Sequence, residues 1–86
     1  MKEINYRKIL ADNVRAFRNH EGSSQMDFAL NVGVSTDTIN NIENQKTNVT
    51  LFMVEILAEY MGISTANIFT ENYVSKHVLS KGAWDI

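Results

Sequence analysis

The feature that most constrains the fold is a tight turn around Gly33, which separates two short stretches with helical periodicity. Apolar Phe28 and Val32 precede the turn at the spacing of one helix face, and Ile39 and Ile42 follow it at a similar spacing. Glycine accepts the left-handed backbone conformation in which many helices end. Two helices joined by so short a turn must bury their apolar faces against each other and a third element, which predicts a helix-turn-helix unit.

Helix limits can be placed from hydroxyl side chains at N-cap positions and glycines at C-terminal ends. Ser24, Ser35 and Thr50 are the expected N-caps. The expected helices span about residues 6–19, 24–32, 35–44, 51–61 and 64–69. The fold class is therefore all-α, with the helix-turn-helix motif at 24–44 inside a domain of residues 1–69. Residues 70–86 are left as a C-terminal tail.

The expected helix 51–61 is apolar on two faces. One stripe is expected to face the core: Leu51, Val54, Leu57, Ala58 and Met61. A second stripe contains Phe52, Ile56 and Tyr60, and a helix apolar on more than one face is usually buried on more than one face. Two alternatives remain for what packs on the second stripe: the tail, which contains Trp84, or a second copy of the chain. In the second case Phe52, Ile56, Tyr60 and Trp84 are the candidate dimer surface.

Residue types exclude several function classes. With 86 residues the chain fits one domain, and without cysteine it offers no disulfide or thiolate metal site. His20 and His77 are its only histidines, and no carboxylates are paired at ligand spacing, so neither a metal nor another cofactor is expected. No motif of an enzyme active site occurs, and no apolar run is long enough to cross a membrane. We expect a non-enzymatic, cytoplasmic protein.

Charge is divided unevenly along the chain, which has a net charge of −2. Residues 1–50 carry six basic and six acidic side chains, whereas residues 51–86 carry two basic and four acidic ones. DNA-binding proteins are often basic, because contacts to phosphates supply much of their affinity. The acidic excess therefore argues against DNA binding, but its position leaves room for a local positive face in the N-terminal part.

The pattern across the turn resembles the Cro and phage-repressor family of helix-turn-helix transcription regulators. The likeness rests on Ser24-Gln25-Met26-Asp27-Phe28-Ala29, Gly33-Val34-Ser35, Ile39, Ile42-Glu43-Asn44, Lys46, Gly62-Ile63-Ser64 and Ile68-Phe69. It covers about residues 6–69 and implies a five-helix, lambda-repressor-like domain with a short C-terminal extension. It also implies double-stranded DNA as the ligand, a homodimer as the binding unit and repression as the usual outcome.

The resemblance implies roles for individual residues. Base contacts are implied for Thr36, Asp37, Thr38 and Asn41, with Asn40 beside them. Contacts to the sugar-phosphate backbone are implied for Gln25, Ser35, Asn44, Lys46 and Thr47, and Asn48 extends this set. Arg18 and Glu43 match a pair that forms an internal salt bridge. The alternative is that Gln25 and the polar side chains of residues 36–41 are ordinary solvated surface, and the motif favours the DNA roles.

Several positions depart from the family pattern. Gln45 replaces the usual glycine after Asn44, which predicts strain or a shift of register in that turn, and Val49 replaces a common proline. The helix at 35–44 has no Lys or Arg, so it offers no bidentate contact to guanine. Met26 and Leu30 are apolar where the family is usually polar, and they could form a protein contact.

Three functions fit these observations. The first is a dimeric, sequence-specific transcription regulator whose third helices enter successive major grooves about 34 Å apart. The second is a DNA-binding antitoxin that grips a toxin through its tail or through Met26 and Leu30. The third is a protein-interaction domain that has lost DNA binding, which the net negative charge favours. The motif favours the first.

Overall fold

The described part of the chain folds into five α-helices and one π-helix. The computed structural model describes residues 3–79, without the side chain of residue 79. The elements are α1 (Tyr6–Glu21), α2 (Gln25–Val32), α3 (Thr36–Glu43), α4 (Leu51–Met61), α5 (Thr65–Ile68) and the π-helix η1 (Val74–Leu79). The all-α prediction is confirmed, and each expected helix end lies within two residues of the observed one. None of the described helices is long and apolar enough to cross a membrane.

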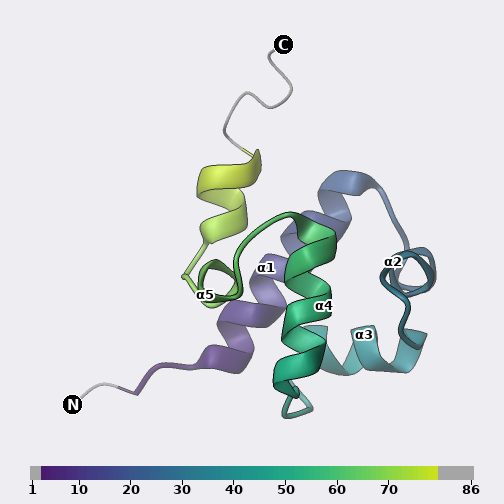
Figure 1. Cartoon of the computed structure of the whole chain (residues 1–86), viewed down its shortest axis with the longest axis horizontal. Coiled ribbons are helices and arrows are strands. Elements are labelled where there is room, and N and C mark those ends of the chain that lie inside the picture. Colours follow the sequence, from purple (N-terminus) through teal and green to yellow (C-terminus); the bar gives the residue numbers. More distant parts are fainter. Residues whose placement is uncertain (1–2, 80–86) are drawn as a thin grey trace.

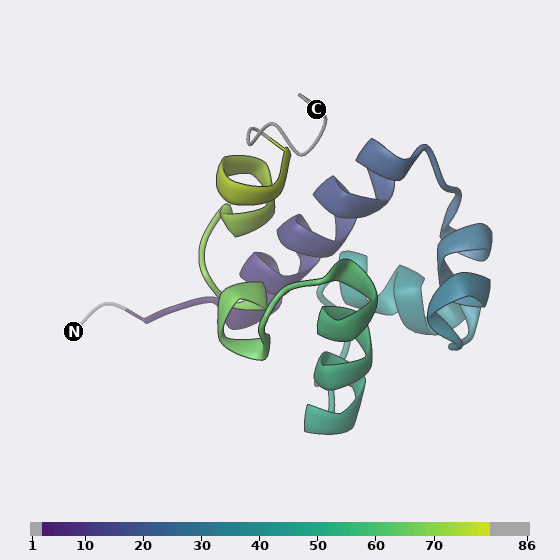
Figure 2. The same ribbon diagram turned by 45° about the horizontal axis from the view of Figure 1, so that its top comes forward.

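The helices surround α1, the longest of them. Figure 1 shows α4 crossing in front of α1, with α2 and α3 to one side and α5 and η1 to the other. The second view keeps this arrangement, with α1 running between the two flanking groups (Figure 2). As a result α1 is the element that both groups of short helices can contact.

Short polar side chains fix where the helices begin. Asn5, Ser24, Ser35, Thr50 and Ser64 each accept a hydrogen bond from the backbone N–H three residues later, at 3.0–3.1 Å. Each such cap satisfies one of the unpaired N–H groups of a first helical turn and stabilises the helix by about 1 kcal/mol. The three N-caps predicted from sequence, at Ser24, Ser35 and Thr50, are therefore confirmed.

Gly33 closes the turn between α2 and α3. Its φ is 95°, in the region that glycine enters without steric cost. The N–H groups of Gly33 and Val34 both donate to the carbonyl of Ala29, at 2.8 and 2.9 Å. This compact closure sets α3 across α2 so that the apolar faces of the two helices meet.

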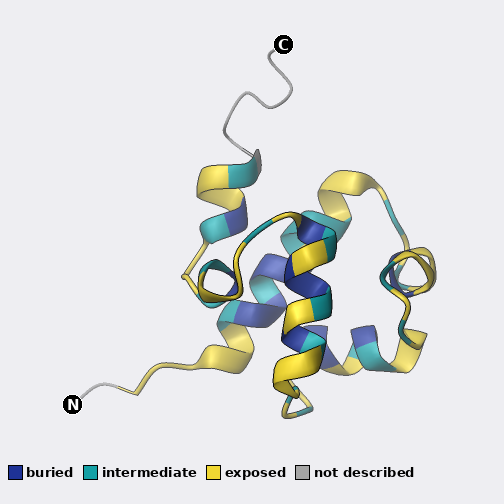
Figure 3. Ribbon diagram, viewed as in Figure 1, coloured by how far each residue is buried: buried dark blue, intermediate teal, exposed yellow. Residues whose placement is uncertain are grey.

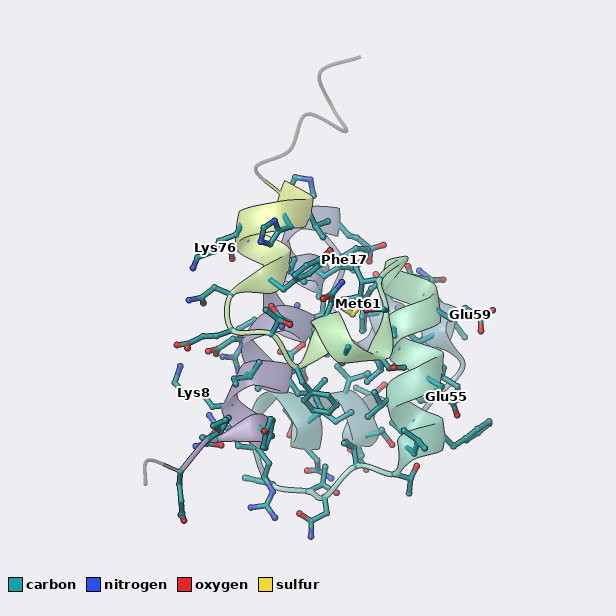
Figure 4. All side chains as sticks on the ribbon, turned by 60° about the vertical axis from the view of Figure 1, so that its left-hand side comes forward. Lys8, Phe17, Glu55, Glu59, Met61 and Lys76 are labelled. Atoms are coloured by element: carbon teal, nitrogen blue, oxygen red, sulfur yellow. The ribbon has the colours of Figure 1, made fainter. Side chains whose placement is uncertain are left out.

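A single apolar core joins all six elements. It contains Leu10, Val14, Phe28, Ala29, Ile39, Ile42, Val54, Leu57, Ala58, Met61, Ile68 and Val74. Figure 3 shows the buried segments of α1, α3 and α4 facing one another across this core. Phe17 and Met61 point into the same space from α1 and α4 (Figure 4). The core therefore includes a residue of η1, beyond the domain boundary expected at residue 69.

The structure corrects one core assignment on α4 and divides the second stripe. Leu51, expected to face the core, is 72% exposed because it is the first residue of α4, whose first turn projects past the body (Figure 3). Phe52 is also 69% exposed, and Ile56 is half-buried. Tyr60, at the other end of the stripe, packs edge-on against Phe17 and Phe28 of the same chain, with ring centroids 6.1 and 5.4 Å apart. Among residues 3–79, the chain thus covers one end of this stripe and leaves the other end exposed.

Asn13 fastens the C-terminal elements to α1. It is 1% exposed, and its side-chain amide donates to the carbonyls of Ile68 and Thr70 at 2.9 and 3.0 Å. Its carbonyl oxygen accepts from the N–H of Val74 at 3.1 Å, and the Val74 side chain is fully buried. The part of the tail around η1 thus covers the core on the side of α1. Trp84 lies outside the described residues.

Candidate nucleic-acid interface

α3 has a buried face and an exposed face. Ile39, Ile42 and Glu43 are buried against the other helices. The exposed residues on the outer side are Thr36, Asp37 and Asn41, followed by Asn44 at the C-cap. An α-helix with its side chains is about 10–12 Å wide, which matches the B-DNA major groove of about 12 Å. The outer face is therefore a polar surface on a rod of suitable width.

Thr38 and Asn40, the other two predicted base-contact residues, are half-buried and already hydrogen-bonded. The hydroxyl oxygens of Thr38 and Ser35 are 2.7 Å apart, so Ser35 serves both as N-cap and as partner of Thr38. The amide of Asn40 donates to the side-chain carbonyl of Gln25 at 3.1 Å. These two residues therefore lie at the margin of the exposed face, whereas Thr36, Asp37 and Asn41 form its centre.

Glu43 is the centre of a polar network behind this face. Its carboxylate is almost fully buried, with only 2% of the residue exposed. Arg18 donates to it twice, from Nε at 2.7 Å and from Nη2 at 3.0 Å, and Gln25 donates from Nε2 at 3.2 Å. Arg15 donates to the main-chain carbonyl of Glu43 at 2.7 Å, and its Nε lies 3.5 Å from the carboxylate. The predicted pair of Arg18 and Glu43 is present and is one part of a larger network.

The network holds Glu43 in its charged form. Burial alone raises the pKa of the Glu43 carboxyl, because it removes water from the ionised group. The hydrogen bonds from Arg18 and Gln25, together with the charges of Arg18 and Arg15, outweigh burial and bring the pKa below its ordinary value. The hydrogen bond to Glu43 likewise raises the pKa of Arg18. Both partners therefore stay ionised in the folded protein.

Gln25 links this network to the outer face of α3. A carboxylate only accepts hydrogen bonds, so the NH₂ group of Gln25 faces Glu43 and its carbonyl faces Asn40. Arg18 also donates to the carbonyl of Ser23 at 2.9 Å, just before α2. The start of α2, the end of α3 and α1 are thereby joined. Gln25 therefore lies against α3 through its hydrogen bonds to Glu43 and Asn40.

The turn after α3 keeps a regular closure without a glycine. The N–H groups of Gln45 and Lys46 donate to the carbonyls of Ile42 and Asn41, at 3.1 and 2.9 Å, which is the Schellman pattern. Gln45 occupies the left-handed position of this motif with a φ of 60°. A side chain in that conformation costs about 1–2 kcal/mol relative to the right-handed one. The strain expected at Gln45 is present, and the register of the closure is retained.

The predicted backbone-contact residues fall in two places. Gln25 and Ser35 lie at the starts of α2 and α3, where unpaired N–H groups and the helix dipole favour an anion. Asn44, Lys46 and Thr47 lie in the turn that follows α3. Asn44 donates to the carbonyl of Asn40 at 2.9 Å. These two groups flank the exposed face of α3.

The sequence interpretation missed two residues that join α1 to the rest of the fold, Arg15 and Asn13. Arg15 lies three positions before Arg18 on α1, so both reach the end of α3, and this spacing was a usable signal. Asn13 had no local signal, because its partners lie 55–61 positions away in the sequence.

Met26 and Leu30 are exposed on α2, one turn apart.

Comparisons with known proteins agree with this architecture. A family model described as "Helix-turn-helix" matches residues 14–68. The control protein C.SmaI of Serratia marcescens is 34% identical over 67 residues, which make up 78% of this chain and 80% of that protein. The Neisseria hypothetical transcription factor of Neisseria meningitidis serogroup B is 31% identical over 62 residues, 72% of this chain and 58% of that protein.

A crystal structure gives the same result at the level of the fold. The hypothetical transcription factor NHTF from Neisseria superposes with a TM-score of 0.74 and 27% identity, over 83% of this chain and 82% of that one. The family match begins on α1 and ends at the last residue of α5. It therefore contains α2, α3 and the network around Glu43, and it stops before Val74.

Proposed function

The chain belongs to the Cro/C1-type helix-turn-helix family of DNA-binding transcription regulators, and we propose that it is a sequence-specific repressor that reads the major groove with α3. Members of this family are not enzymes. The observation that carries the proposal is the exposed polar face of α3, backed by a buried ionic network that fixes its position. The names of the two relatives, a control protein and a transcription factor, also support a regulatory role.

Within α3 we assign base contacts first to Thr36, Asp37 and Asn41, because these three are exposed. Asn41 can pair with the edge of adenine, and Asp37 can accept from the amino group of cytosine. Thr38 and Asn40 follow at the margin, where binding would require them to exchange their present partners. With only short polar side chains and one acid, this face is suited to discriminate bases more than to supply raw affinity.

Affinity then depends on contacts to the sugar-phosphate backbone. Gln25 and Ser35 sit at helix starts that favour phosphate. The other residues of this group, Asn44, Lys46 and Thr47, lie in the turn after α3, where Lys46 supplies a positive charge. The acidic side chains Glu55 and Glu59 belong to α4 and project outward from it (Figure 4). Part of the acidic excess of the chain is thus carried by α4, whereas on α3 Asp37 is the only exposed acid and Glu43 is buried against Arg18.

We propose that two copies bind together, with their third helices about 34 Å apart on a near-palindromic site. The open end of the second stripe on α4, around Phe52 and Ile56, is the proposed dimer surface. Leu51, the residue before Phe52, extends the exposed apolar surface of this first turn. Tyr60 contributes less than the sequence implied, because Phe17 and Phe28 already cover it. Sedimentation of wild type and Phe52→Ser checks this: wild type should dimerise at lower concentration than the variant.

The central test is selection of bound duplexes from a random pool, followed by affinity measurements on the enriched sequence and a scrambled one. Asn41→Ala should narrow the affinity difference between the two duplexes, because it removes a base contact. Gln25→Ala should weaken both about equally, because it disturbs a backbone contact. Asn19→Ala, an exposed asparagine on the last turn of α1, is the control and should change neither.

Selection at low salt can also overturn the proposal. If no sequence is enriched and the protein binds no duplex, a protein-interaction domain becomes the better description. In that case the exposed pair Met26 and Leu30 on α2 would be the first surface to examine. If all duplexes bind equally, the protein is a DNA-binding protein without the proposed sequence specificity.

A further inference from the structure

Arg7, in the first turn of α1, reaches the turn that follows α3. Its guanidinium donates to the side-chain carbonyl of Asn48, which is 41 positions away in the sequence. Arg7 also lines one hollow with Thr47, Asn48 and Val49, so Arg7 borders this turn. The resemblance gave Arg7 no role, and the contact joins it to the residues proposed to touch the DNA backbone.

The place of Arg7 extends the proposed interface to the other side of the turn. Figure 1 shows the turn at the start of α4, with α3 on one side and the first turn of α1 on the other. Lys46 lies within the turn and is exposed. Arg7 and Lys46 thus place two cations along this edge, and neither forms an ion pair with a carboxylate among residues 3–79.

The other cations on α1 differ in this respect. Arg18 and Arg15 are held by Glu43, at 2.7 and 3.5 Å. Lys8, the neighbour of Arg7, pairs with Asp12 at 2.7 Å and projects outward from α1 (Figure 4). Among these four, only Arg7 combines exposure, a position beside the turn and a neutral partner. An amide orients a guanidinium without neutralising its charge.

We propose that Arg7 contacts a DNA phosphate, and that Arg7 and Lys46 together hold one stretch of backbone beside the groove read by α3. This inference rests on the proposed DNA-binding function. A guanidinium has five N–H donors. Only Nη2 donates to Asn48, so other N–H groups of Arg7 can bind phosphate oxygens in bidentate geometry. Asn48 is then a positioning residue that aims Arg7 along the turn. The alternative is that the Arg7–Asn48 contact only ties α1 to the turn.

Salt dependence separates these two roles. Each phosphate neutralised by a cation adds about 0.9 to the slope of log affinity against log salt concentration on B-DNA. A structural tie changes the melting temperature and leaves that slope unaltered. The experiment therefore compares wild type, Arg7→Gln, Arg7→Lys and Lys8→Gln. Arg7→Gln and Lys8→Gln remove one positive charge from adjacent positions, so Lys8→Gln is the matched control for the general electrostatic field.

Binding is measured by titration over a range of salt on two probes, the duplex enriched by selection and a mixed-sequence duplex. Arg7→Gln should lower the slope by about one on both probes and weaken binding roughly three- to tenfold at about 0.1 M salt. Lys8→Gln should keep the wild-type slope, and Arg7→Lys should restore most of it because the charge is retained. Melting of each variant without DNA accounts for any loss of folded protein.

Two results would overturn the inference. One is an Arg7→Gln slope equal to that of wild type. The other is an equal loss for Arg7→Gln and Lys8→Gln, which would indicate a diffuse field rather than a contact. Failure of the proposed function is distinguishable: wild type would then bind neither probe, or bind both alike. In the latter case the slope comparison still decides whether Arg7 touches phosphate.

Discussion

Glu43 and Asn13 are both buried polar residues, and each joins α1 to a different part of the fold. Glu43 binds two arginines of α1 and the start of α2, and so positions the face proposed to read DNA. Asn13 binds only main-chain groups, at Ile68, Thr70 and Val74, and so positions the C-terminal elements. One link is ionic and involves several side chains, whereas the other is neutral and made by one amide.

This difference has energetic consequences. Ionised groups are stable in a protein interior only while their partners remain, so loss of one partner leaves an uncompensated buried charge. Loss of a buried amide side chain leaves its main-chain partners without that hydrogen bond. The free energy of unfolding then falls by about 1–3 kcal/mol for each group that water cannot reach. The link through Glu43 should therefore be the more sensitive to substitution and the only one of the two that responds to pH.

The largest effect is expected when the ionic link is broken. Arg18→Ala should lower the free energy of unfolding by about 3–5 kcal/mol, because it leaves Glu43 buried without its main partner. Urea denaturation followed by circular dichroism measures this. Lys8→Ala, which breaks the exposed pair with Asp12, is the control and should leave the free energy of unfolding almost unchanged.

A double replacement sharpens the same point. Arg18→Met with Glu43→Leu removes both charges and keeps an apolar filling, so it should recover much of the stability lost in Arg18→Ala. If the double variant is no more stable than Arg18→Ala, the loss arises from packing and not from a stranded charge.

Breaking the neutral link should have a smaller and more local effect. Asn13→Ala removes the hydrogen bonds of the Ile68 carbonyl and the Val74 N–H to this amide, while the Thr70 carbonyl still accepts from the N–H of Tyr73, and it should lower the free energy of unfolding by about 2–3 kcal/mol. Amide hydrogen exchange should show the loss of protection concentrated in residues 74–78, with α2 and α3 little changed. Asn19→Ala serves as the exposed control. Uniform loss of protection would contradict the assignment of Asn13 to the C-terminal elements alone.

Acid should weaken one link and spare the other. The pKa of Glu43 is lower in the folded protein than its ordinary value, so its stabilising contribution is complete above the unfolded pKa of about 4.3. The contribution is lost as pH falls below that value through the folded pKa. Asn13 does not titrate. Urea denaturation from about pH 6 to 2.5 measures the free energy of unfolding at each pH. Asn13→Ala should show the wild-type dependence on pH, whereas the double variant Arg18→Met with Glu43→Leu should show a weaker one.

The smallest effects concern two residues with positive φ, one beside each link. Gln45 follows Glu43 by two positions with a φ of 60°, and Asn72 precedes Val74 by two positions with a φ of 56°. Asparagine tolerates this conformation better than glutamine. Gln45→Gly should therefore stabilise the protein by about 1 kcal/mol, whereas Asn72→Gly should change stability by less than about 0.5 kcal/mol. Equal gains at both positions, read from thermal melting, would show that residue type does not matter here.

The helices were predictable from the sequence because their signals are local. Ser24, Ser35 and Thr50 sit next to the helices they cap, and Gly33 sits in the turn it permits. The pairing of Glu43 with Arg18 spans 25 positions, but it came from the resemblance rather than from spacing.

The remaining features depend on where distant segments meet. The partners of Asn13 are 55–61 positions away and the partner of Arg7 is 41 away, and no periodicity encodes such distances. Leu51 belongs to the apolar stripe of its helix, yet it is exposed because the first turn of α4 extends past the body. Helical periodicity identifies a face but not how far along that face the rest of the chain reaches.

The link at Asn13 also has a consequence for the order of events during synthesis. Its contacts to residues 68, 70 and 74 close loops of 55–61 residues, and such closures are slower than the short-range packing of α2 on α3. While a chain is being translated, the amide of Asn13 leaves the ribosome long before Val74 does. Nascent chains should therefore contain α2 and α3 packed on one side of α1 while the other side is still exposed. That side is covered only when Val74 has emerged and packs against α1.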